Sequence, residues 1–167
     1  MKVKILTTGG TFDKIYDPLL GELVFNHSAV PCMLKRGGCL LDIQVENLFL
    51  IDSLEMQTSH REEILKACKG ALESKIVIIH GTDTLTETAL FLQKHHLDKT
   101  IVITGAMIPY AFKNSDSLFN LALALGFVQT LPHGVYIAFN GQYFKAQEVY
   151  KNKEKGIFEK IEKREKP

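Results

Sequence analysis

The sequence predicts an α/β fold with a doubly wound, largely parallel sheet and helices on both faces, of the Rossmann-like or flavodoxin-like kind. Four short apolar runs predict buried strands, at 3–7, 76–79, 101–104 and 135–139. Their β-branched residues suit parallel strands that are covered on both faces. Segments with helical periodicity lie between these runs, so strands alternate with helices from end to end. That alternation favours βαβ units, in which each crossover places a helix over the sheet.

The helices are predicted from their start signals and the spacing of their apolar residues. Two of them open with a capping box, formed by Ser59 with Glu62 and by Thr84 with Glu87. The expected helices cover 28–35, 59–72, 85–96 and a stretch from 114–116 to about 129.

The remaining segments predict a further strand, a lid and a hairpin. Residues 39–51 contain the strand, and 12–21 predict a loop whose length is typical of a functional lid. The Asn-Gly pair at 140–141 predicts a hairpin turn between 135–139 and an extended segment at 143–149.

Length, charge and cysteine content limit the classes of function that fit this sequence. A chain of 167 residues fits one domain and can bury a substantial core. The net charge of +1 gives no field of one sign, so we expect no nucleic-acid partner and no membrane partner. Cys32, Cys39 and Cys68 lack metal-ligand spacing and predict reduced thiols in a cytoplasmic protein. The start at Met1 shows no signal-peptide pattern, and the apolar segment 121–128 is too short to cross a bilayer.

Polar residues gather in the turns that follow the strands, at 8–11, 52–56, 81–84 and 105–109. Because the carboxyl ends of parallel strands lie at one edge of a sheet, one crevice there is expected to hold Thr11, Ser53, Thr82 and Asp83. Taken singly, each of these residues is equally well explained as a helix cap or a turn residue. The turn at 8–11 lacks the spaced third glycine of a dinucleotide site, and we expect no cofactor and no metal.

Two of these motifs resemble the bacterial-type L-asparaginases. They are Thr-Gly-Gly-Thr at 8–11 and His-Gly-Thr-Asp-Thr at 80–84, which continues to Glu-Thr-Ala at 87–89. The turns at 52–56 and 105–109 and the helix start at 115–120 are similar to weaker segments of the family. The pattern from 134 to 152 also follows the family and places Lys151 on its catalytic lysine. The resemblance implies hydrolysis of the side-chain amide of L-asparagine, or of a related small amide, to aspartate and ammonia.

The resemblance also implies a role for each site residue. Thr11 is the expected nucleophile, and Tyr16 on the lid polarises it. Thr82, Asp83 and Lys151 form a second group, in which the lysine amine deprotonates Thr82 or an attacking water. Backbone N–H groups at the two glycine turns stabilise the oxyanion. The expected oxyanion and substrate-binding residues are Gly10, Asp52, Ser53, Gly81 and Ala106.

The resemblance covers only the first half of the family, whose members are about twice this length. We therefore expect an asparaginase-like N-terminal domain at 1–152, a charged C-terminal tail at 153–167 and no second domain. Within the tail, Ile157, Phe158 and Ile161 suit one apolar stripe on a short, mostly solvated helix. In the family a neighbouring subunit completes the pocket, so we expect a homodimer or a higher homo-oligomer.

Two alternatives to an independent amidohydrolase remain open from the sequence. The first is an amino-acid-binding module that keeps the crevice with little or no activity. The second is an amidase subunit that needs a partner chain.

Overall fold

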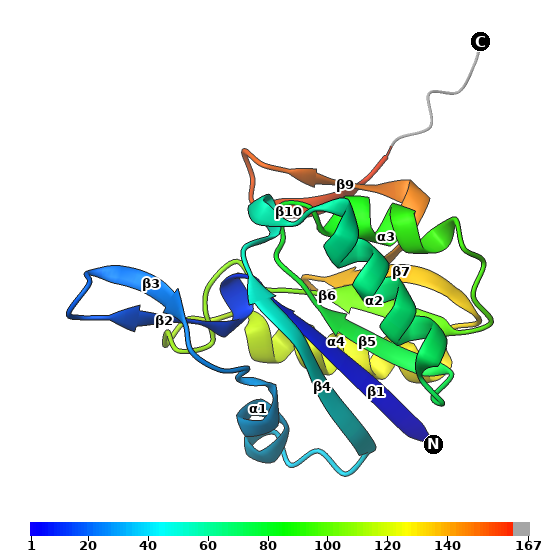
Figure 1. Ribbon diagram of the computed structural model, residues 1–167, viewed down its shortest axis with the longest axis horizontal. Helices are drawn as coiled ribbons and strands as arrows, with labels where there is room; N and C mark the ends of the chain where they lie inside the picture. The colour runs from blue at the N-terminus through cyan, green and yellow to red at the C-terminus, as the bar shows by residue number, and fades with distance from the viewer. Residues whose placement is uncertain (162–167) are drawn as a thin grey trace.

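The computed structural model describes residues 1–161, which form a six-stranded sheet with helices on both sides and two small hairpins (Figure 1). In spatial order the strands of the sheet are β4 (Asp42–Ile51), β1 (Lys2–Gly9), β5 (Lys75–Ile79), β6 (Thr100–Thr104), β7 (Gly134–Phe139) and β8 (Gln142–Lys145). The first five are parallel, and β8 runs antiparallel to β7. Numbered along the chain, the parallel strands have the spatial order 2-1-3-4-5 of flavodoxin-like folds. The predicted fold class is confirmed.

The helices are α1 (Val30–Arg36), α2 (Thr58–Gly70), α3 (Leu85–Gln93) and α4 (Ser117–Thr130). Alternate residues of each central strand face opposite sides of the sheet, so one strand contributes side chains to two hydrophobic cores. In β5, Ile76 and Ile78 pack in the core that α2 and α3 cover, whereas Val77 and Ile79 pack in the core under α1 and α4. This double coverage explains why the strand is apolar at every position from 76 to 79.

The segment predicted as a loop at 12–21 contains structure, and that prediction is wrong. A short 3₁₀ turn, η1 (Thr11–Asp13), leads into the antiparallel hairpin of β2 (Lys14–Asp17) and β3 (Glu22–Phe25). Asp17 closes the hairpin because its carboxylate accepts the N–H groups of Leu19 and Leu20. This hairpin, called the lid hairpin below, projects from the edge of the molecule, to the left in Figure 1.

The end of the described chain also forms a hairpin, so the predicted solvated helix with a stripe at 157–161 is wrong. After η3 (Ala146–Glu148), β9 (Val149–Asn152) pairs with β10 (Ile157–Lys160). Phe158 is buried, and its ring lies 4.8 Å from that of Phe139 between centroids. Residues 157–160 therefore form a paired strand rather than a tail, residues 153–155 form the exposed turn before it, and 162–167 lie outside the described residues.

Helix starts were predicted less accurately than strand ends. Helix α2 begins at Thr58, and its box is formed by Gln57, whose N–H donates to the ring of His60 at 3.0 Å, so Ser59 and Glu62 are not the capping pair. Thr84 precedes α3 without capping it, because its hydroxyl donates to the carbonyl of Ser53. The hairpin turn at 140–141 is confirmed between β7 and β8.

Within residues 1–161, every helix falls short of the length and apolarity that a membrane-crossing helix requires.

Candidate functional site

The candidate site lies where the order of the sheet reverses, between β1 and its neighbours β4 and β5. Three turns meet there with almost no space between their backbones. Gly10 has φ +74° and ψ −175°, a conformation that glycine alone adopts readily. A Cβ on Gly10 would collide with the backbone of Gly81, and a Cβ on Gly81 would lie 2.6 Å from that of Ser53. Such switch points are where open α/β sheets bind ligands.

Lys151 reaches this crevice from β9 and joins the two polar residues of the turn after β5. Its Nζ donates to Thr82 Oγ1 at 2.8 Å and to Asp83 Oδ1 at 2.7 Å. The lysine side chain is 12% exposed and that of Asp83 is 35% exposed. The three side chains assigned to the second group are thus in direct contact, although 68 or 69 residues separate the lysine from the pair in the chain.

The turn at 52–55 locks onto the turn at 81–84. Ser53 is buried, and its Oγ accepts the N–H of Asp83 at 3.2 Å. The hydroxyl of Thr84 donates to the carbonyl of Ser53 at 2.8 Å. These two bonds fix Asp83 beside Ser53, which is the arrangement expected of residues that share one substrate.

Thr11 is half-buried at the start of η1, directly after the glycine pair of the first turn. Tyr16 lies on β2 of the lid hairpin, opposite Leu23, and is 56% exposed. Among residues 1–161, no hydrogen bond joins Tyr16 to Thr11. The role predicted for Tyr16 stays a prediction.

The predicted oxyanion donor at Gly10 needs a correction. Its N–H donates to the carbonyl of Ile51 at 2.9 Å, because the first turn is bonded to the end of β4. Gly10 serves instead by allowing the close approach of Gly81. The N–H groups of Gly81 and Thr82 donate to no group within the described part of the chain, although both residues are buried.

The turn after β6 carries Ala106, which is 1% exposed, and is fixed by Asn120 of α4 and by Asp116, the residue before that helix. Asp116 accepts the N–H groups of Met107 and Ile108, at distances from 3.0 to 3.1 Å. Asn120 donates to the carbonyl of Gly105 at 3.0 Å and is fully buried. The start of this helix was predicted from the sequence, but the bond from Asn120 to the turn was not.

A second ion pair links the lid hairpin to the crevice, and nothing in the sequence pattern predicted it. Lys14 Nζ lies 2.5 Å from Asp52 Oδ2, and the other carboxylate oxygen accepts the N–H of Leu54. Burial opposes ionisation of Asp52, but the bonds from Lys14 and Leu54 and the charges of Lys14 and Lys151 outweigh it. Together they hold the pKa of Asp52 below its usual value. Both carboxylate oxygens of Asp52 thus already accept a hydrogen bond from the protein.

Asp13 ties the two ends of the lid hairpin together. Its Oδ1 accepts the N–H of Ala29 at 2.8 Å and the hydroxyl of Ser28 at 3.2 Å. Its Oδ2 is buried and receives no hydrogen bond from any residue in 1–161. Burial raises the pKa of Asp13 to about 6, against the two bonds and the charge of nearby His27.

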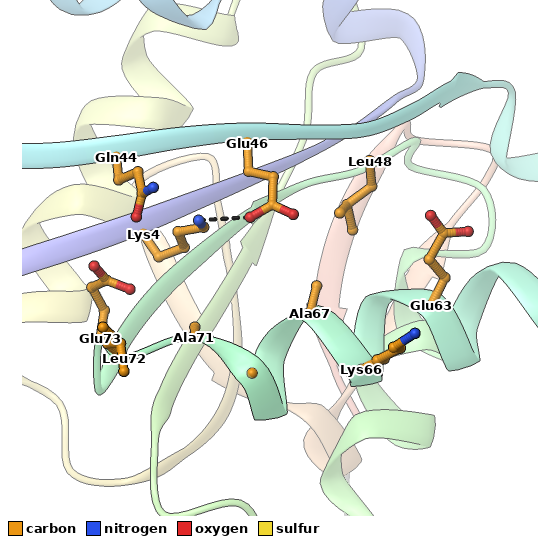
Figure 2. A pocket seen from close by; sticks show the side chains of 11 residues that line it. Lys4, Gln44, Glu46, Leu48, Glu63, Lys66, Ala67, Ala71, Leu72 and Glu73 are labelled. Atoms are coloured by element: carbon orange, nitrogen blue, oxygen red, sulfur yellow. Dashed lines mark ion pairs between the residues drawn. The ribbon is translucent and has the colours of Figure 1, made fainter.

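A separate hollow of about 480 Å³ lies between β4 and α2, and none of the strand-end residues lines it. Figure 2 shows the ion pair of Lys4 and Glu46 on its wall, with 2.6 Å between Nζ and Oε2. Among the described residues, no group of three or more histidine, cysteine or acidic side chains is placed to hold a metal ion.

Fold and site together define an α/β protein whose threonine, lysine and aspartate cluster stands at the switch point of a flavodoxin-like sheet. The family model described as Asparaginase, N-terminal matches residues 2–162. The chain belongs to the asparaginase family.

Known proteins agree with this assignment. The glutaminase-asparaginase of Pseudomonas aeruginosa is 32% identical over an alignment of 162 residues that covers 89% of this chain and 45% of that protein. The thermostable L-asparaginase from Thermococcus kodakarensis superposes with a TM-score of 0.86 at 29% identity, covering 96% of this chain and 51% of that one. A probable cytoplasmic L-asparaginase from Campylobacter jejuni gives 0.74 at 31% identity, covering 90% and 49%. The chain spans about half the length of the relatives it matches.

Proposed function

We propose that this chain hydrolyses the side-chain amide of L-asparagine, or of a related small amide, through a threonine nucleophile. The contact of Lys151 with both Thr82 and Asp83 is the observation that supports this most. If Thr82 and Asp83 only formed a cap or turn, no contact with a largely buried lysine 68 residues further along the chain would be needed. An ammonium that donates to a hydroxyl oxygen stabilises negative charge as it develops there.

The proposed reaction has two steps. Thr11 Oγ1 attacks the side-chain carbonyl carbon, the hydroxyl proton is passed to the amide nitrogen, and ammonia leaves while an ester forms on Thr11. Water, activated in the group of Thr82, Asp83 and Lys151, then attacks the ester and releases aspartate. The free N–H groups of Gly81 and Thr82 suit the oxyanion of both steps.

The other site residues are assigned to holding the substrate. Ser53 and Asp83 suit the carboxylate and amino groups on its α-carbon, and the carbonyl of Ala106 suits the N–H of the leaving amide. Asp52 contributes at the same turn, where it also anchors Lys14. A zwitterionic amino acid suits a crevice that carries both a basic and an acidic group, Lys151 and Asp83.

Ammonia release from asparagine and from glutamine tests the proposal. Wild-type protein should release ammonia, and Thr11→Ala should lose several orders of magnitude in rate with an unchanged fold. Thr58→Ala, at the exposed start of α2, is the matched control and should keep the wild-type rate. Equal rates in Thr11→Ala and wild type would reject the nucleophile. Aspartate binding by calorimetry without any ammonia release would favour an amino-acid-binding module instead.

We also propose that the chain self-associates as a homodimer or higher homo-oligomer in the cytoplasm. Leu19 and Leu20 at the tip of the projecting lid hairpin are 94% and 65% exposed, and exposed apolar groups of this kind favour interfaces. The three free cysteines suit a reducing compartment. Light scattering at micromolar concentration should show a dimer, and a monomer there would reject the proposal. Cell fractionation tests the location.

A further inference from the structure

A chain of buried polar side chains lies beneath the turn after β5, and the reaction proposed above does not use it. His80, Thr88 and Arg61 come from the end of β5, from α3 and from α2, and their exposed fractions are 0%, 0% and 9%. Arg61 Nε lies 3.2 Å from Thr88 Oγ1, which lies 2.8 Å from His80 Nε2. His80 Nδ1 lies 2.8 Å from the carbonyl oxygen of Gly81. Removing polar groups from water costs free energy, and hydrogen bonds between the buried groups offset that cost.

The donor in each of these bonds follows from the chemistry of the partners. A carbonyl oxygen only accepts, so Nδ1 of His80 carries the proton that bonds to Gly81. Burial lowers the pKa of His80 to about 4, so the ring is neutral and Nε2 is an acceptor. Thr88 must then donate its hydroxyl proton to Nε2, and it accepts from Arg61, which only donates. All the bonds therefore run in one direction, from Arg61 through Thr88 and His80 to Gly81.

Further bonds of Arg61 hold the first member of this hydrogen-bond series in place. Arg61 also donates to the carbonyl of Met56 at 3.3 Å and pairs with Glu87 at 2.9 Å. Met56 Sδ lies 3.1 Å from His80 Nε2, but two unprotonated atoms form no hydrogen bond there. The guanidinium is thus fixed on α2 and α3, and His80 has a single orientation.

The bond to Gly81 orients the peptide group between Gly81 and Thr82. That peptide is trans, so its C=O and N–H point in opposite directions. The carbonyl points at the His80 ring, which places the N–H of Thr82 on the side away from the ring. No group in residues 1–161 accepts that N–H. A hydrogen bond to the carbonyl also polarises the peptide and makes its N–H a stronger donor.

We propose that His80 is a positioning residue, which aims and polarises the N–H of Thr82 as a hydrogen-bond donor to the substrate in the crevice. Thr88 and Arg61 hold the ring in the required tautomer. The inference rests on the proposed amide hydrolysis, but it concerns how one N–H group binds a ligand. It can therefore be tested by binding as well as by turnover.

Two near-isosteric variants separate positioning from simple packing. In His80→Asn the amide nitrogen takes the place of Nδ1, so the donor to Gly81 is kept and the contact with Thr88 is lost. In His80→Gln the amide reaches the place of Nε2, so the contact with Thr88 is kept and the donor to Gly81 is lost. His133→Gln, in an exposed loop, is the control for histidine replacement.

Titration with aspartate, followed by the NMR signal of the Thr82 amide, is the deciding experiment. We expect a saturable shift in wild type, in His133→Gln and in His80→Asn, and its loss in His80→Gln. In the ammonia assay, kcat should fall about tenfold or more in His80→Gln, with a smaller change in KM and a much smaller loss in His80→Asn. The same amide shift in both His80 variants, or no shift in wild type at saturation, would overturn the inference.

The tautomer of His80 can also be measured on the wild-type protein, so this test does not depend on whether the variants fold. The imidazole nitrogen spectrum should show Nδ1 protonated and Nε2 unprotonated, with no titration between about pH 7 and about pH 5. The opposite tautomer would overturn the inference. Absence of ammonia release from wild type would reject the proposed hydrolysis, while the aspartate titration would still decide the role of His80.

Discussion

The turns at the carboxyl ends of the strands and the lid hairpin both contribute to the candidate site, but they are built in opposite ways. The turn after β5 is buried, is in contact with the turns after β1 and β4, and is bonded to Lys151 and Ser53. The lid hairpin projects from the body, with Leu19, Leu20 and Tyr16 largely exposed. The first region is suited to fixed chemistry, whereas the second is suited to movement.

The largest expected effect is on the chemistry of the fixed region. Lys151→Met keeps the aliphatic stem and removes the amine, so we expect ammonia release to fall about 10²–10⁴-fold. The melting temperature should change little, because Asp83 is 35% exposed and can be hydrated. Lys153→Met, on an exposed turn of the same hairpin, is the control. Full activity in Lys151→Met would place the base elsewhere.

The next effect is on the packing of the turns. Gly10→Ala should destabilise the protein by about 2 kcal/mol or more, because the alanine is strained at this φ and its Cβ collides with Gly81. Gly21→Ala at the lid tip, with φ +70° and no atom within 4 Å of the added Cβ, carries the strain without the collision. Chemical denaturation should therefore rank the losses as Gly10 above Gly21. Equal losses would show that the turns are not packed as described.

Asp13 ties the two ends of the lid hairpin together, and its ionisation gives a test by pH. The pKa in the folded state, about 6, lies above the ordinary value of 3.8, so the folded state binds the proton more tightly. Stability from this group is present below about pH 4 and is lost as the pH rises through 6. Its ionisation should cost about 2–3 kcal/mol at pH 7. In Asp13→Asn that component of the pH dependence should vanish, and its persistence would assign it to another group.

The smallest effect is expected at the contact between the lid hairpin and the crevice. A double-mutant cycle with Lys14→Met and Asp52→Asn should give a coupling of about 1 kcal/mol, since the pair is partly buried. The affinity for aspartate should change more than the stability, because the pair holds the lid hairpin against the substrate-binding turn. A coupling near zero would mean that the hairpin moves independently of Asp52.

The same contrast explains what could be predicted from the sequence. The buried strands at 76–79 and 101–104 were predicted because burial on both faces forces a continuous apolar run. Their turns were predicted because each begins with a glycine, Gly81 or Gly105, where the structure leaves no room for a Cβ. The lid hairpin was missed, since its strands are four residues long, exposed and closed by the single side chain of Asp17.

Contacts between residues far apart in the sequence were the second feature that could not be predicted. The hairpin of β9 and β10 is rich in Lys and Glu, and nothing local shows that Phe158 packs against Phe139. Lys151 was assigned through the family resemblance and not from its neighbours in the chain. His80 gave no signal of its own, because its partners Thr88 and Arg61 lie on two different helices.

Trapping the covalent intermediate would identify the nucleophile of the proposed hydrolysis. Wild-type protein should be quenched in acid during turnover of asparagine, digested, and its peptides mapped by mass spectrometry. We expect an aspartyl ester on Thr11, absent in Thr11→Ala and in samples quenched before substrate is added. An ester on Thr82, or steady ammonia release in Thr11→Ala, would contradict this expectation.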